Sequence, residues 1–206
     1  MFPIPQKHDP PESSQTRPDK PRIAKSNLEL LVEVLTSVGF WGGLSALVAL
    51  VSLALPWWGI TVQPSTLNTF WGLLFGPQSQ PANVTFFPDK LNAALAANGS
   101  VMTGLVLLAS LSTIIGTLLK RTLILTTSLT LSIITVVSFF ADVGNAVGNE
   151  CTGAGLPQDY SCINTIVGQG SSGASLMTWG FQAGFYTFIG STTLLLGTLV
   201  LQRNKQ

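Results

Sequence analysis

Four long apolar runs divide the chain, and the charged residues and prolines lie in the segments outside them. The runs cover residues 34–55, 101–119, 122–141 and 176–201, and none contains a charged residue or a histidine. A helix needs about 20 predominantly apolar residues to cross the hydrocarbon core of a bilayer. The pattern therefore predicts an all-α integral membrane protein in which four transmembrane helices form an antiparallel bundle.

The first helix is expected to begin before its apolar run. Ser26 and Glu29 have the spacing of a capping box, in which the two side chains satisfy free backbone N–H groups at a helix start. We therefore expect one helix over residues 26–55, ended by Pro56. The run is too long, and too far from the N-terminus, for the apolar segment of a secretory signal. It is interpreted as a retained span, with cleavage after Ala54 as the minority alternative.

Two longer connections are predicted to form a small cap on the side of the membrane opposite the termini. These are residues 56–100 and 142–175, whereas the second and third runs are separated only by a tight turn at Lys120 and Arg121. Within the first connection, residues 58–63 are partly alternating and predict a short β-segment. Residues 89–97 predict a short helix that leads into the second span.

The N-terminal tail, residues 1–25, is proline-rich and contains almost no aliphatic residues. Such a segment cannot bury enough apolar surface to offset the entropy of ordering. We interpret it as a solvated tail, and the alternative is an extended arm that lies on a partner subunit. It holds half of the twelve prolines of the chain: Pro3, Pro5, Pro10, Pro11, Pro18 and Pro21.

The distribution of charged residues predicts the orientation of the chain in the membrane. Only 9% of the residues are charged, against roughly 25% in a soluble domain. Basic residues gather on the cytoplasmic side of membrane proteins. Both termini, including the short tail at 202–206, are therefore expected in the cytoplasm. The protein is expected in the plasma or cytoplasmic membrane of a cell. The chain has a net charge of only +1, and its basic residues are expected along one face of the membrane, so no nucleic-acid partner is expected. Nine of the ten basic residues agree on this side: Lys7, Arg17, Lys20, Arg22, Lys25, Lys120, Arg121, Arg203 and Lys205.

Tryptophans mark the expected outer boundary of the membrane. Trp57 and Trp58 close the first apolar run, and Trp179 lies near the start of the fourth. Amphipathic indole rings are favoured at the headgroup level, so these residues, with Trp71, are interpreted as interface anchors. The apolar patch 70–75 around Trp71 must in addition fold back onto the bilayer, pack under the cap or meet a partner.

The outer connections also hold candidate modification sites. Cys151 and Cys162 are the only cysteines and share the second connection, where an oxidising compartment favours a disulfide. Closing that ring would stabilise the loop by about 2 to 3 kcal/mol. Asn83 and Asn98 begin N-x-S/T triplets and are glycosylation candidates.

Small and hydroxylated residues recur inside the predicted spans. Gly39 with Gly43, and Gly180 with Gly184, fit G-x-x-x-G, which allows two helices to approach closely. Packing within this bundle is the first interpretation, and docking of another subunit is the second. In the third span Ser128, Ser132 and Thr135 recur at helical spacing, and we expect them to hydrogen-bond across helices rather than to line a pore.

Residues that carry chemistry are scarce. The only histidine, His8, lies in the tail, which argues against a haem, a histidine-based metal site or a Ser-His-Asp triad. No charged residue lies at mid-membrane, where pumps and proton relays need one. Gln182 is the one strongly polar residue expected deep in the fourth span, where it is interpreted as an interhelical contact. We therefore expect no enzyme activity, no cofactor and no metal.

One segment resembles a known family. Leu55-Pro56 ends the first run, Trp57 or Trp58 follows, and a short β-prone stretch leads to Trp71-Gly72-Leu73-Leu74. This arrangement is similar to the first extracellular loop of claudins and the wider peripheral myelin protein group. The resemblance covers about residues 38–142 and implies four spans, cytoplasmic termini and a helix leading into the second span. The family has a cysteine pair in its first extracellular loop, and the corresponding connection of this chain has none. The resemblance therefore implies the architecture of the family rather than its function in paracellular sealing.

Three functions are compatible with these patterns. The first is a non-catalytic accessory or scaffolding subunit that acts through lateral helix contacts and its N-terminal arm, with the bilayer, other membrane subunits or further copies of itself as partners. The second is a claudin-like adhesion or barrier protein of the cell surface. The third is a small channel or carrier for an uncharged solute.

Overall fold

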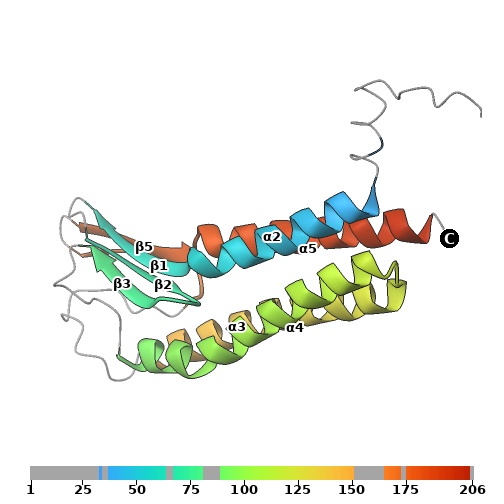
Figure 1. The fold of residues 1–206 in the computed structure, drawn as a ribbon. Helices are drawn as coiled ribbons and strands as arrows, with labels where there is room; N and C mark the ends of the chain where they lie inside the picture. Colours follow the sequence, from blue (N-terminus) through green and yellow to red (C-terminus); the bar gives the residue numbers. More distant parts are fainter. Residues whose placement is uncertain are drawn as a thin grey trace, which may run out of the picture.

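In the computed structural model, four helices lie side by side and meet a small β-sheet at one end (Figure 1). α2 (Val38–Ala54) is followed directly by the sheet, and α5 (Ala183–Arg203) emerges from it. α3 (Asp89–Leu118) and α4 (Thr122–Glu150) form a hairpin whose turn lies at the opposite end, next to the C-terminus. The structure describes residues 33, 37–63, 67–80, 89–150, 165–172 and 175–204.

Three of these helices are long and apolar enough to cross a membrane. Their qualifying stretches are Leu95–Leu118, Thr122–Asn145 and Ala183–Arg203, while α2 is a shorter apolar helix of 17 residues. These three helices thus have the length and composition that the predicted spans require. With a rise of 1.5 Å per residue, α2 is about 25 Å long, slightly less than the roughly 30 Å of the hydrocarbon core.

The first helix does not run unbroken from residue 26. Ser37 is extended, with φ −79° and ψ 135°, and its Oγ accepts a hydrogen bond from the Phe40 N–H at 3.1 Å. A serine hydroxyl that caps a free N–H in this way starts a helix anew. The predicted single helix over 26–55 is therefore wrong, and α2 begins at Val38. Ser26 and Glu29 lie outside the described residues.

Both outer helix ends extend beyond the predicted spans. α3 runs continuously through Asn98 and Gly99, so the expected short helix 89–97 and the second span form one helix of 30 residues. α4 continues past Asp142 to Glu150. The predicted boundaries at 100 and 142 were wrong because polar residues were taken to end the helices. Here two of those polar residues satisfy each other, since the Asn98 amide donates to the Asp142 carboxylate at 2.9 Å.

The turn between α3 and α4 closes with a motif that is common at helix ends. Lys120 has a positive φ of 52°, its N–H donates to the Thr117 carbonyl at 3.3 Å, and the Arg121 N–H donates to the Gly116 carbonyl at 2.9 Å. These two bonds are those of a Schellman motif, in which a left-handed residue ends the helix. The tight turn predicted at this position is confirmed.

The sheet is larger than the sequence suggested. Five strands pair in the order β3-β2-β1-β5-β4, and every neighbouring pair is antiparallel. The predicted β-segment at 58–63 lies within the central strand, so it is confirmed, whereas an all-α description with one short β-segment is too narrow. The strands are β1 (Pro56–Gln63), β2 (Leu67–Gly72), β3 (Gly76–Gln80), β4 (Gly168–Ser172) and β5 (Ser175–Phe181).

The predicted start of the fourth span, at residue 176, is wrong for a physical reason. Residues 176–181 form strand β5, in which Trp179 pairs with Ile60 and Phe181 with Trp58. A short apolar run does not distinguish a strand from a buried helix by periodicity alone. Pairing with β1 decided the outcome, and α5 therefore starts only at Ala183.

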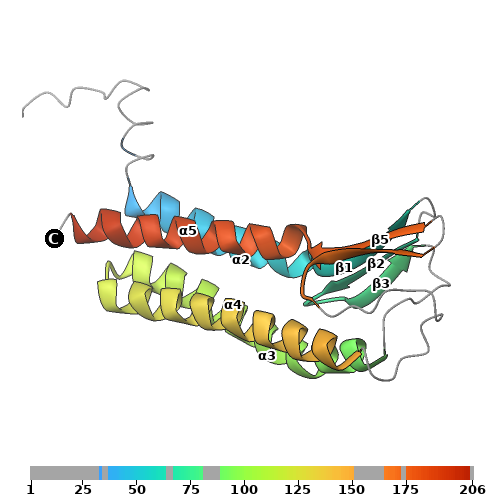
Figure 2. The same ribbon diagram turned by 180° about the vertical axis from the view of Figure 1, so that it is seen from behind.

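The core lies where the sheet meets the helices. Trp57, from β1, is fully buried and packs against Phe139 and Phe188 with ring centroids 5.1 and 5.3 Å apart. Phe185 stacks on Phe181 at 4.2 Å. Along the bundle, α2 packs mainly on α5 and α3 on α4, as the reverse view also shows (Figure 2). The aromatic cluster thus joins sheet and bundle into one hydrophobic unit.

Candidate functional site

The four tryptophans interpreted as interface anchors are buried in the protein. Their exposed fractions are 0% for Trp57 and Trp58, 1% for Trp71 and 6% for Trp179. A lipid-facing anchor must present its ring to the headgroups. The interpretation as anchors is therefore wrong, because these rings fill the junction between sheet and bundle.

Three of these indoles fasten separate segments together. Trp57 Nε1 donates to the Ser52 carbonyl, where α2 ends, at 2.8 Å. Trp58 Nε1 donates to the Ile166 carbonyl, and Trp179 Nε1 donates to the Thr165 carbonyl, both at 2.8 Å. Buried Trp N–H groups usually find such partners. The bonds from Trp58 and Trp179 hold the segment that leads into β4 against the two central strands.

Two exposed apolar side chains at the sheet end belong to the β2–β3 turn. Leu74 and Phe75 are 52% and 60% exposed, whereas the preceding Leu73 is buried. Gly72 pairs with Pro56, so this turn lies level with the end of α2. Thr103 Oγ1, on α3, donates to the Leu73 carbonyl at 3.3 Å. Of the three fates expected for patch 70–75, Trp71 and Leu73 pack under the cap, and the next two residues stay on the surface.

The first G-x-x-x-G pair, Gly39 and Gly43, has almost no neighbouring atoms in the position of a side chain. A Cβ built on Gly43 meets no atom within 4 Å, and one built on Gly39 meets only Ser37 Oγ, at 4.0 Å. Gly42 is the glycine that serves packing inside the chain, because its Cβ would come within 2.9 Å of Thr117 Cγ2 on α3. Gly39 and Gly43 are thus both exposed, and Gly39, in the first turn of α2, also borders a cavity at that end of the bundle.

The second G-x-x-x-G pair does not lie on one helix. Gly180 is in β5 and faces Val167, whereas Gly184 is in the first turn of α5. A Cβ on Gly184 would lie 2.5 Å from Trp57 Cδ1 and 2.7 Å from the Leu55 carbonyl oxygen. The predicted shared helix face is therefore wrong, although Gly184 does allow a close approach.

One of the three predicted hydroxyl groups bridges two helices. Ser128 Oγ, on α4, donates to the Ala109 carbonyl on α3 at 2.6 Å and lies 2.6 Å from Thr113 Oγ1. Ser132 and Thr135 are buried but donate to carbonyls of their own helix. The prediction of cross-helix bonding is confirmed for Ser128 and is wrong for the other two.

The closest polar contact between α2 and α5 was not foreseen. Ser45 Oγ donates to the Ser191 carbonyl at 2.9 Å, and Ser191 Oγ donates to the Ser45 carbonyl at 2.8 Å. The two serines are 146 positions apart in the chain. In the sequence, each of these serines is only a small residue inside an apolar run. Many other residues of the chain fit that description, so the contact could not be predicted.

The expected polar residue of the fourth span lies elsewhere. Gln182 precedes α5 at the sheet end, where its backbone N–H donates to the Trp57 carbonyl at 2.9 Å. Its predicted deep position was wrong because the residues before it form a strand. Asn98 lies inside α3 rather than in a loop, while Cys151, Cys162 and Asn83 lie outside the described residues.

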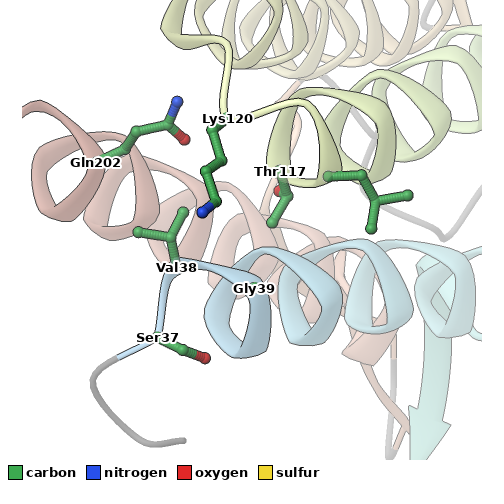
Figure 3. Close-up of a pocket in the computed structure, with 7 residues that line it drawn as sticks. Ser37, Val38, Gly39, Thr117, Lys120 and Gln202 are labelled. Atoms are coloured by element: carbon green, nitrogen blue, oxygen red, sulfur yellow. The ribbon is translucent and has the colours of Figure 1, made fainter. Parts of the chain in front are cut away.

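A cavity of about 480 Å³ lies at the end of the bundle that is remote from the sheet (Figure 3). Gln202 lines it from α5 and Lys120 from the α3–α4 turn, and the Lys120 side chain extends toward the start of α2 at Val38. Gln202 is 4% exposed, and neither its Oε1 nor its Nε2 has a hydrogen-bond partner. The remaining lining residues are Ser37, Val38, Gly39, Thr117 and Leu118.

Metal chemistry finds no support in the part of the chain that the structure describes. Within it, no group of three or more His, Cys, Asp or Glu side chains could hold an ion.

No protein-family model, curated protein or solved structure matches this chain. The candidate sites are therefore the exposed surfaces and the cavity described above, each argued from its own geometry.

Proposed function

We propose that the chain is a four-span protein of a cell membrane, with the sheet outside and both termini in the cytoplasm. The sheet lies at one end of the bundle, and Lys120, Arg121 and Arg203 lie at the other. This distribution of basic residues supports the orientation. α2, an apolar helix of 17 residues, is proposed to cross the membrane together with α3, α4 and α5.

Within that membrane, the chain acts as a non-catalytic accessory or scaffolding subunit through lateral helix contacts. The observation that carries this proposal is the exposed face of α2 at Gly39 and Gly43, where a side chain would meet almost nothing of the chain itself. Small residues on a lipid-facing helix let a second backbone come close, which is how helices associate in a bilayer. The face continues with the exposed Leu47 and Leu50.

The length of α2 points in the same direction. A span shorter than the hydrocarbon core is accommodated by thinning of the bilayer or by association with other helices. At about 25 Å, α2 falls short of the core by roughly 5 Å. A partner helix on its glycine face would reduce the exposed mismatch as well as fill the open space.

Replacement of Gly43 by leucine tests this proposal. Since nothing lies within 4 Å of the new Cβ, the Gly43→Leu chain should fold normally, yet its added side chain should hold a partner helix away. We expect the assembly purified from native membranes in mild detergent to lose its partner or its second copy, measured by mass in solution and by what co-purifies.

Gly197→Leu is the matched control. Gly197 is also an open, exposed glycine, but it lies on α5, so this substitution should leave the assembly intact. A wild-type protein that is monomeric and alone in mild detergent would contradict the subunit proposal. So would equal assembly of the two variants.

A second candidate is a claudin-like surface protein whose outer part contacts a neighbouring cell or envelope layer. It is favoured by the exposed Leu74 and Phe75 and by the sheet, whose edge strands are β3 and β4. Exchange of the exposed Leu74 and Phe75 for serine should then abolish assembly at contacts while membrane insertion survives. Unchanged contact assembly after the exchange would reject this candidate.

A further inference from the structure

The cavity at the end of the bundle remote from the sheet carries an inference beyond lateral assembly. Its walls come from three separate places in the fold: the start of α2, the α3–α4 turn and the end of α5. Its volume of about 480 Å³ lies within the usual range for small-molecule sites, roughly 300 to 1,000 Å³.

Several polar groups of this cavity can donate hydrogen bonds to a ligand, beside two acceptors, Gln202 Oε1 and Thr117 Oγ1. Lys120 supplies an ammonium group, and Gln202 supplies an amide whose Nε2 has no partner. Ser37 Oγ accepts from the Phe40 N–H, so its hydroxyl hydrogen can be directed at a ligand. Val38 and Gly39 begin α2, and backbone N–H groups of a first helical turn lack intrahelical acceptors.

The electrostatics of these groups suit an anion. The N-terminus of a helix carries partial positive charge and is a common place for phosphate to bind. The lining set contains one cationic side chain and no carboxylate. The carboxyl ends of α3 and α5 also lie here, but the last carbonyls of α3 at Thr117 and Gly116 already accept from the turn, and Val200 already accepts from the Asn204 N–H.

The helix start alone would not define a site, but Gln202 adds an independent observation. An amide that is 96% buried without any partner leaves a polar group desolvated, at a cost of about 1 to 3 kcal/mol. A ligand that accepts from Nε2 would remove much of that cost. The remaining walls, Val38 and Leu118, are apolar, so the ligand should be polar at one end only.

We infer that this cavity binds the phosphate group of a phosphate-bearing amphiphile, with Lys120, Gln202 and the start of α2 around the phosphate. An anionic phospholipid of the adjacent leaflet has this chemistry, because its phosphate lies at the depth where a span ends and its acyl chains continue along apolar helix faces. The same phosphate chemistry is available from a soluble phosphate ester, and the experiment distinguishes the two.

The test uses the full chain, stripped of lipid in mild detergent, with phosphatidylglycerol and diacylglycerol, which has the same acyl chains but no phosphate, as probes in native mass spectrometry. We expect phosphatidylglycerol to bind about tenfold more tightly, which corresponds to roughly one charge-assisted hydrogen bond. Lys120→Gln and Gln202→Leu should each weaken phosphatidylglycerol binding about tenfold. Because Lys120 is exposed, its substitution should leave the fold intact even if that at Gln202 does not.

Arg203→Gln is the matched control, since it removes one positive charge at the same end without lining the cavity. Its effect should stay within about twofold, as for an exposed charge. Equal binding of the two lipids would overturn the inference, as would an unchanged affinity in both cavity variants or an equal loss in Arg203→Gln. Displacement of phosphatidylglycerol by millimolar glycerol 3-phosphate would support the phosphate site and assign it to a soluble ester.

Discussion

At the scale of single residues, equivalent residue types have opposite roles depending on what faces them. Gly42 and Gly43 are neighbours on α2, yet one faces Thr117 and the other faces open space. Trp57 and Leu74 are both apolar residues at the level where α2 meets the sheet, but the tryptophan is buried and the leucine is half exposed. A residue's function here is set by its direction more than by its type.

Gly184 provides the first prediction at this scale. Gly184→Ala would bring its Cβ to 2.7 Å from the Leu55 carbonyl oxygen and 2.5 Å from Trp57 Cδ1, and backbone cannot move away as a flexible side chain can. We expect a loss of about 1 to 3 kcal/mol, as for overpacking of a core, measured as a lower melting temperature in detergent. Gly190→Ala is its control: no atom lies within 4 Å there, and alanine should stabilise α5 by up to about 1 kcal/mol. Equal effects of the two substitutions would contradict this account.

The serine pair between α2 and α5 provides a second prediction. Each hydroxyl of Ser45 and Ser191 donates to the other residue's carbonyl, and interhelical bonds of this kind contribute about 0.6 kcal/mol on average in a membrane protein. Because each acceptor is a backbone carbonyl, Ser45→Ala and Ser191→Ala should each remove one bond and lower the stability by about 0.5 to 1 kcal/mol, measured by thermal unfolding of the single and double variants in detergent. Strictly additive losses would mean that the two bonds do not depend on each other.

At the scale of helices and strands, the ends of the elements matter most. Ser37 restarts a helix, Lys120 closes one in a left-handed conformation, and Pro56 converts the end of α2 into β1. Each junction places a polar or aromatic group where two elements meet. The cavity proposed to bind phosphate exists because two such junctions, Ser37 and Lys120, lie opposite the end of α5.

The α3–α4 turn gives the prediction at this scale. A non-glycine residue in the left-handed region is disfavoured by about 1 to 2 kcal/mol, and Lys120 has a φ of 52°. Lys120→Gly should therefore raise stability by about 1 kcal/mol, measured by thermal unfolding in detergent without added lipid. Lys120→Ala is the comparison, because it removes the same side chain but keeps the strain. If the alanine variant gained as much, the gain would not come from the backbone.

At the scale of the whole molecule, the sheet and the helices share one aromatic core. Phe139, on α4, is fully buried and lies 5.1 Å from Trp57 and 5.7 Å from Phe185, ring centroid to ring centroid. These three residues come from three different elements. We infer that the sheet is a part of the folded unit rather than an appendage to a bundle.

Phe139→Ala tests that inference. Loss of a buried phenylalanine costs about 3 to 5 kcal/mol, and a shared core should spread this loss over the whole structure. We expect unfolding followed by helical circular dichroism and unfolding followed by tryptophan fluorescence to shift together, as in a two-state transition. Leu119→Ala, at an exposed apolar position near the turn, should move neither. A shift confined to fluorescence would show that the sheet unfolds separately.

Much of the helical framework was predictable because the length of an apolar run is a local property. The runs that begin at 101 and 122 became α3 and α4, the turn at Lys120 lies where it was expected, and 58–63 is a strand. A bilayer requires about 20 apolar residues in sequence, so these features are visible without knowledge of any neighbour.

By itself, then, the sequence determined the number of long apolar segments, the tight hairpin and the absence of charge within the four apolar runs. Only the tertiary structure decided the roles of Gly42, Gly184, Trp57, Ser45 and Gln202, and the strand that replaced the start of the fourth run. Each of these depends on what lies opposite: β1 beside residues 175–181, Thr117 beside Gly42, Ser191 beside Ser45. Contacts between residues far apart in the chain leave no periodic signal in either segment, and so they are settled by packing.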